Sequence, residues 1–325
     1  PHILQRVRSG HFRAGPLSKH AAPRYLGVVF HTVYSSAMLG RRTEGSVICP
    51  SFGNLVGVRD DECLTCGRRN PGLWGFGPIL AKLGRGSMDD AFVQFVIVSC
   101  VVMYDASLLI DYESIRLNGL MNFLSPSTEG LFVFGASGSL PVFGYGRWWT
   151  VLSATWLHGG LIHIFFNMYW VKMIGPMLIE HYGLSRMIVI YTLAGVSGFV
   201  ATSFAGYYLV FVPGIFQGAT ITIGASAAIF GMIGALIYYG RRTGSSAVYQ
   251  QAKQWAIFLF IFGLIFPGID NWAHLGGLVG GYFAAKWMDP LKPERLDHTV
   301  AALACLVLSA LSIVLSVVHG LQFIR

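Results

Sequence analysis

Long apolar stretches separated by short polar ones dominate the chain from residue 91 onward. A helix needs about 20 largely apolar residues to span a bilayer, and a bilayer span is the simplest reading of each stretch. Seven such runs occur, at 91–110, 151–174, 187–209, 222–240, 254–269, 272–288 and 299–320. A short turn separates the fifth run from the sixth, which predicts a tight helical hairpin. The pattern therefore predicts an all-α polytopic membrane protein.

Composition and charge agree with this class. Of the 325 residues, 54% are hydrophobic and 12% charged, a balance that a water-soluble domain of this size rarely tolerates. If residues 1–89 are cytoplasmic, 20 of the 23 Lys and Arg residues lie on that side of the membrane. The positive-inside rule then places the N-terminus in the cytoplasm. The basic residues are dispersed, so we expect no nucleic-acid partner.

The first 37 residues contain no acidic residue and do not begin with Met. We expect residues 1–37 to be a leader, either disordered or wrongly placed ahead of a true start at Met38. A transit peptide is the alternative, because stretches rich in Arg and free of acids also resemble organelle signals.

A cysteine module follows the leader. Cys63-Leu64-Thr65-Cys66-Gly67 has the form of a zinc knuckle, in which the glycine lets backbone N–H groups approach the thiolates. The matching turn, 49–53, begins with Cys49 but has Phe52 where the second cysteine belongs. Two interpretations stay open. In the first, Cys49, Cys63 and Cys66 bind zinc together with a ligand from outside the module. In the second, the module has lost its zinc site and its cysteines are reduced thiols.

A serine and a histidine stand at the starts of two late apolar runs. Gly224 and Ala225 precede Ser226, and His274 opens a run that contains Gly276 and Gly277. Polar groups in hydrocarbon are costly and usually functional, and a serine beside a histidine is the basis of nucleophilic hydrolysis. Glycines spaced four apart let helix backbones approach closely, which would bring the serine within reach of the histidine.

The same two runs are short for a bilayer. Residues 225–239 and 273–287 make helices of about 15 residues, or about 22 Å against a hydrocarbon core near 30 Å. If their cytoplasmic ends are flush with the basic loops, Ser226 and His274 lie below the outer surface. We therefore expect them at the floor of a water-accessible cavity.

A third motif, His158-x4-His163-x3-Asn167, lies in the second run. His163 and Asn167 are four residues apart, so they project from one helix face, and both can donate hydrogen bonds. Together with the backbone N–H of Ser226 they could surround a developing oxyanion. A zinc site built from His158, His163 and His274 is the alternative, but no glutamate of a His-Glu-x-x-His motif accompanies these histidines.

These motifs resemble those of the rhomboid family of intramembrane serine proteases over residues 91–288. The resemblance implies a bundle of six core transmembrane helices with a C-terminal seventh, and a Ser226–His274 dyad that needs neither an acid nor a cofactor. It also implies oxyanion donors at His163 and Asn167, and structural roles near the site for His158 and Gly224. The cysteine module resembles a zinc ribbon fused to the front of bacterial rhomboids. One departure is Trp149-Thr150, because many relatives have Trp-Arg there.

We therefore expect four parts: the leader 1–37, a zinc-ribbon-like module at 38–80, a rhomboid protease core at 90–290, and a linker with the seventh helix at 291–325. The expected activity is endoproteolysis of transmembrane segments of other proteins in the lipid bilayer. The resemblance favours the bacterial inner membrane. Two alternatives are a catalytically silent rhomboid-like scaffold that binds membrane proteins and a transporter, although no inverted repeat is visible.

Overall fold

The computed structural model of the chain describes residues 44–49, 54–73, 91–117, 119, 123–212, 216–266 and 268–323. The chain divides into two compact units, residues 1–40 and 41–325. All of the described residues belong to the second unit. The leader expected at 1–37 lies outside the described residues, as does Phe52.

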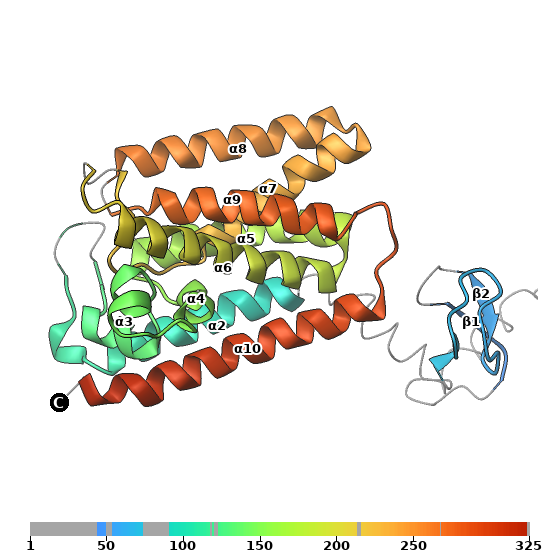
Figure 1. Ribbon diagram of the computed structural model, residues 1–325, viewed down its shortest axis with the longest axis horizontal. Helices are drawn as coiled ribbons and strands as arrows, with labels where there is room; N and C mark the ends of the chain where they lie inside the picture. Colours follow the sequence, from blue (N-terminus) through green and yellow to red (C-terminus); the bar gives the residue numbers. More distant parts are fainter. Residues whose placement is uncertain are drawn as a thin grey trace, which may run out of the picture. The chain divides into compact units, whose positions relative to one another are not determined.

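Seven long helices form the described part of the chain beyond residue 91 (Figure 1). The segment between the first two long helices contains four shorter ones: α3 (Thr128–Phe134), η3 (Leu140–Gly144), α4 (Thr150–Ser153) and η4 (Ala154–Trp156). The predicted helical bundle is confirmed. The long helices are α2 (Ala91–Leu109), α5 (Leu161–Tyr182), α6 (Leu184–Tyr208), α7 (Ser226–Thr243), α8 (Ser246–Ile265), α9 (Asn271–Trp287) and α10 (Leu296–Gly320).

Two helices begin far from the positions that hydropathy predicts. The second helix begins at Leu161 and not near 151, because Gly160 is fully extended and separates α5 from the short helices α4 and η4. The fifth helix begins at Ser246 and not at 254, because its first two turns are polar and apolar composition does not mark them. It ends at Ile265, where Phe266 turns extended ahead of a proline in the sequence.

Among the described residues, four helices are long and apolar enough to cross a membrane: α2, α5, α6 and α10. Helices α7 and α9 have 18 and 17 residues. At 1.5 Å per residue they are about 27 and 26 Å long, more than the sequence predicted but still less than a hydrocarbon core of about 30 Å. The chain is an integral membrane protein whose two short helices lie within a frame of longer ones.

Helix α9 packs against α6 and α7 through two stripes of glycine. Gly276 and Gly280 face α6, whereas Gly277 and Gly281 face α7. A Cβ atom added at Gly277 would overlap the carbonyl oxygen of Ala227. The backbones of α7 and α9 therefore touch directly, as the spacing of four predicted.

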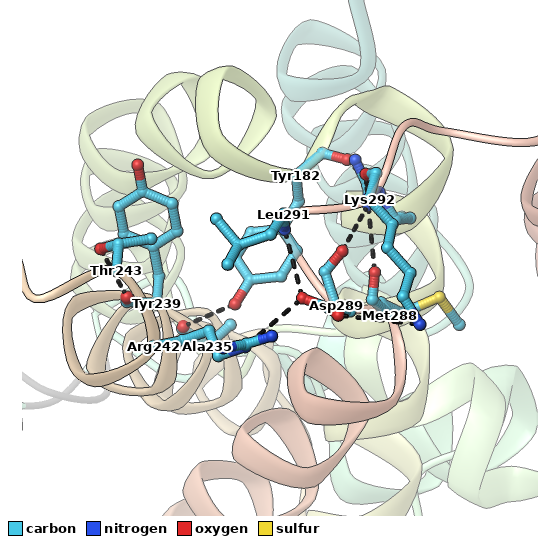
Figure 2. Close-up of polar contacts among 10 residues, drawn as sticks. Tyr182, Ala235, Tyr239, Arg242, Thr243, Met288, Asp289, Leu291 and Lys292 are labelled. Atoms are coloured by element: carbon cyan, nitrogen blue, oxygen red, sulfur yellow. Dashed lines mark hydrogen bonds and ion pairs between the residues drawn. The ribbon is translucent and has the colours of Figure 1, made fainter. Parts of the chain in front are cut away.

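The linker between α9 and α10 is fastened to the start of α6 by a buried arginine. The Arg186 side chain is 4% exposed, and its backbone N–H donates to the carboxylate of Glu294 at 2.9 Å. One turn earlier the Tyr182 hydroxyl donates to the Ala235 carbonyl at 3.1 Å, which joins α5 to α7 (Figure 2). The Arg186 guanidinium donates to three linker carbonyls, those of Met288, Asp289 and Lys292, at 2.8–3.0 Å.

Candidate active site

Ser226 and His274 meet where α7 and α9 begin. Ser226 is the first residue of α7 and His274 the fourth of α9. The Ser226 Oγ and His274 Nε2 atoms are 3.0 Å apart, within hydrogen-bond distance, and His274 is 6% exposed. Asp270 caps α9, since its carboxylate accepts from the Ala273 N–H at 3.0 Å. The cap fixes where α9 starts and hence which face carries His274.

The imidazole of His274 is held by an aromatic ring. Phe230 stacks on it with ring centroids 4.2 Å apart and planes 19° from parallel. Phe230 lies one helical turn after Ser226 and so shares its face of α7. Within the described residues, His274 Nδ1 has no hydrogen-bond partner. Stacking and the serine hydroxyl therefore orient the ring. Sequence reasoning missed Phe230, although an aromatic residue four positions after the serine was a signal.

The tautomer of His163 follows from a backbone contact. The Gly159 N–H donates to His163 Nδ1 at 3.2 Å, so the ring proton of this neutral imidazole is on Nε2. That nitrogen faces Gly224, where an added Cβ would lie 2.8 Å from His163 Nε2 and 3.8 Å from Ser226 Oγ. Gly224 has φ +125°, which side chains rarely adopt. Glycine thus leaves a space bordered by an N–H donor and the serine hydroxyl.

Asn167 lies on α5 one turn beyond His163. Its Nδ2 atom donates to the His163 carbonyl at 2.8 Å, and among the described residues its Oδ1 atom has no partner. The side chain is 5% exposed. No hydrogen bond joins Asn167 to Ser226 or His274, all three of which are described. One N–H of the amide is left available.

His158 packs against the ring of His163. Its ring is completely buried and lies 5.2 Å from that of His163, edge to face. The described residues His158, His163 and His274 do not form a group that could bind one metal ion. In the described part of the chain, the one group of three side chains that could hold an ion consists of cysteines. The alternative of a histidine zinc site has no support here.

The segment before α5 is braced by Arg147, which the sequence analysis did not single out. Arg147 is 2% exposed, and its guanidinium donates to the Phe132 carbonyl at the end of α3 and to the Ser316 carbonyl in α10, both at 2.8 Å. Thr150, where many relatives carry arginine, donates to the Arg147 carbonyl at 2.8 Å. A buried arginine three positions earlier thus ties this segment to the last helix.

The braced segment also holds the strand-like stretch that leads to Ser226. Ser137 and Thr222 exchange two backbone hydrogen bonds, of 3.0 and 2.8 Å. The Gly224 N–H then donates to the Ala154 carbonyl at 2.9 Å. A chain of contacts therefore connects α10, through this segment, to Gly224, two residues before Ser226. These contacts join residues far apart in the sequence, so no local sequence pattern indicates them.

The cysteines form a separate cluster beside a small hairpin. Strands β1 (Ser46–Ile48) and β2 (Leu55–Gly57) pair antiparallel, and the Sγ atoms of Cys49, Cys63 and Cys66 all lie within 4.8 Å of one another. Sulfurs bound to one zinc at 2.3 Å stand about 3.8 Å apart in a tetrahedron, and Cys49 Sγ and Cys66 Sγ are 3.7 Å apart. Hydrogen bonds from the backbone of Thr65 and Cys66 lower the pKa of Cys63 to about 7. These cysteines fit three corners of a zinc site.

The fold and the site define a class: an integral membrane protein with a half-buried serine and a buried histidine where two short helices begin. Residues 145–289 match the family model of the Rhomboid domain, and this range contains the serine, the histidine and the His158–Asn167 motif. This part of the chain is therefore a Rhomboid domain.

Curated relatives support this assignment. The chain is 35% identical over 183 residues to "Rhomboid protease GluP" of Bacillus subtilis, an alignment that covers 54% of this chain and 34% of the relative. It is 31% identical over 167 residues to "RHOMBOID-like protein 6, mitochondrial" of Arabidopsis thaliana, covering 49% of this chain and 50% of the relative. The chain thus spans about a third to a half of the length of these relatives.

Proposed function

We propose that this chain is an intramembrane serine endopeptidase that acts through Ser226 and His274. The 3.0 Å contact between Ser226 Oγ and His274 Nε2 carries the proposal. A serine hydroxyl within hydrogen-bond distance of an imidazole nitrogen can act as an activated nucleophile, because the ring can take its proton. The B. subtilis relative, named as a protease, supports the same reaction class.

In the proposed reaction, Ser226 Oγ attacks the carbonyl carbon of a substrate peptide bond while its proton passes to His274 Nε2. The tetrahedral intermediate collapses when that proton moves to the leaving amine, and an acyl-enzyme remains. Water then attacks the acyl carbon, giving a proton to His274, and this proton returns to Ser226 Oγ as the carboxyl product leaves. Stacking on Phe230 keeps the imidazole aligned for both transfers.

The oxyanion is proposed to form in the space beside Gly224. His163 Nε2–H borders this space, and the Ser226 backbone N–H and the free N–H of Asn167 are proposed as two further donors. Each donor of this kind is worth roughly 2.7–4 kcal/mol in the transition state of other hydrolases. His158 has an indirect role, because its ring contacts the His163 ring and fixes its position.

The proposed substrates are transmembrane segments of other proteins, because the dyad lies within a membrane domain. A helix must unwind before its carbonyl can be attacked, so small residues and weak helix formers near the cleaved bond are expected. The charge asymmetry of the sequence supports a cytoplasmic N-terminus, and the likeness to a Bacillus protein supports the bacterial cytoplasmic membrane. No cofactor takes part in the reaction.

The cysteine module is proposed to bind zinc through Cys49, Cys63 and Cys66 with a fourth ligand from outside this set. The sulfur separations support it. Zinc bound to the purified full chain should fall from one equivalent to near zero in Cys63→Ser with Cys66→Ser. If the native chain carries no zinc after purification in zinc-containing buffer, the module is a cluster of reduced thiols.

Proteolysis is tested with the full chain in liposomes together with a tagged single-span substrate. Native protein should release a fragment cut within the span, and Ser226→Ala and His274→Ala should each abolish the cut, as should the double variant, because the two residues act as one unit. Co-purification of the span without any cut by native protein would favour the scaffold. Transport without cleavage would favour the transporter.

A further inference from the structure

A groove of about 300 Å³ opens between α7, α8 and α9, away from the dyad. Its cationic rim includes Arg241, which is fifteen residues after Ser226 and thus about 22 Å further along α7. Apolar side chains form much of the lining, among them Ile237, Leu278 and Phe283. Phe283 is 59% exposed, so this wall faces the surroundings of the bundle. The volume is at the lower end of the range for ligand pockets.

Two cations line this groove, one from α7 and one from α8. The Arg241 guanidinium lies 5.5 Å from the ring centroid of Tyr249 and also interacts with the phenol of Tyr282. Lys253 follows Tyr249 by one turn of α8 and lines the same groove. Among the described residues, neither cation has an acidic partner. The lining of a largely apolar groove thus includes two positive charges without an acidic partner and two phenols.

The neighbouring arginine behaves differently. Arg242 lies 3.6 Å from the Asp289 carboxylate, at the start of the linker to α10 (Figure 2). It has the same charge as Arg241, and both side chains are exposed, but Arg242 does not line the groove. Comparing substitutions of Arg241 and Arg242 therefore distinguishes binding in the groove from a general effect of positive charge.

We propose that the groove binds an anionic phospholipid, with its phosphate at Arg241 and Lys253 and one acyl chain along Ile237, Leu278 and Phe283. Guanidinium binds phosphate oxygens through two hydrogen bonds, and an ammonium group adds a second charge. Both cations lie within three turns of a helix end, near the depth of lipid head groups. Basic pockets between membrane helices bind anionic head groups in this way. The site is independent of proteolysis.

Native mass spectrometry of the full chain in detergent tests this site. Phosphatidylglycerol and phosphatidylcholine with identical acyl chains are titrated into native protein, Arg241→Gln with Lys253→Gln, and Arg242→Gln. Native protein should retain phosphatidylglycerol in preference to phosphatidylcholine. The double variant should lose affinity for phosphatidylglycerol by about thirtyfold, since each of the two cations near an anionic head group contributes about 1 kcal/mol. Arg242→Gln should bind like native protein.

Three results would overturn the proposal. Equal retention of the two lipids would show that the head group is not recognised. An equal loss in Arg242→Gln would show a general effect of charge. Competition by free glycerol phosphate at the concentration of the lipid would assign the site to a soluble anion. Thermal unfolding of each variant, measured without added lipid, checks that these exposed substitutions leave the fold intact.

Discussion

Helices α8 and α9 both neighbour α7, yet they differ in how much of their length is buried. Helix α9 meets α7 backbone to backbone along Gly277 and Gly281. Of the twenty residues of α8, only Ala252 and Gly263 are buried, and this helix lies at the edge of the bundle (Figure 1). Its contacts with α5 include Trp255 against Trp170 and Phe262 against Phe166, with ring centroids 5.9 and 6.4 Å apart.

The difference in packing shows which helix pair must hold a fixed distance. A hydrogen bond between groups on two helices is lost if one helix moves by about 1 Å, and contacts between backbones leave no rotamer to absorb such a shift. The pair that carries Ser226 and His274 has this type of packing. Helix α8 carries neither residue, and it approaches the α7 backbone closely where Tyr249 meets Gly240, fourteen residues along the chain from Ser226. We therefore expect its displacement to leave the dyad in place.

The largest effect is expected from Gly277→Val, which breaks the contact between α7 and α9. The added side chain overlaps the Ala227 carbonyl and must push α9 away, because a backbone atom cannot yield. Overpacking of this kind costs about 1–3 kcal/mol or more. Proteolysis should be undetectable in a liposome cleavage assay. Leu275→Val, an exposed position on the same helix, is the control and should retain native activity.

If Gly277→Val keeps native activity, the close approach of the two backbones is not what positions the dyad. Thermal unfolding of both variants shows whether any loss of activity comes with loss of the fold. A fold that survives with an inactive dyad would sharpen the comparison, because it would separate the alignment of α9 from its contribution to stability.

An intermediate effect is expected from Phe230→Ala, which leaves the helices in place but removes the ring under His274. A misplacement of about 1 Å at a reacting group can lower a rate by about a hundredfold. Turnover should fall by about tenfold to a hundredfold, with the larger change in kcat. Phe230→Tyr keeps the ring and should stay near native turnover. Equal turnover of the alanine variant and native protein would mean that stacking does not orient the histidine.

The smallest effect is expected from Trp255→Ala in α8. The substitution removes one ring pair, worth about 0.5–1.5 kcal/mol beyond its buried area, so the melting temperature should fall slightly. The rate at which a small fluorophosphonate labels Ser226 should stay within about twofold of native, because α7 and α9 do not depend on this ring. Loss of labelling to the level of Gly277→Val would contradict the distinction between the two helices.

Sequence alone predicted the helical class, the glycine contacts and the approach of Ser226 to His274, since each has a local signature. Gly277 and Gly281 repeat at the spacing of one helix face, and Ser226 and His274 are polar residues in apolar runs. The start of α8 was missed because its first turns are polar. The bracing contact of Arg147 was missed because it reaches Ser316, 169 residues later, and no pattern of charge or spacing marks a contact of that range.

The central claim is that His274 activates Ser226, and covalent labelling tests it most directly. The full chain in detergent is treated with a fluorophosphonate and the modified residue is identified by mass spectrometry. We predict one labelled residue, Ser226, with labelling lost in Ser226→Ala and reduced to background in His274→Ala, while both variants unfold at temperatures close to that of native protein. Equal labelling of native protein and His274→Ala, or labelling at other serines in place of Ser226, would contradict the claim.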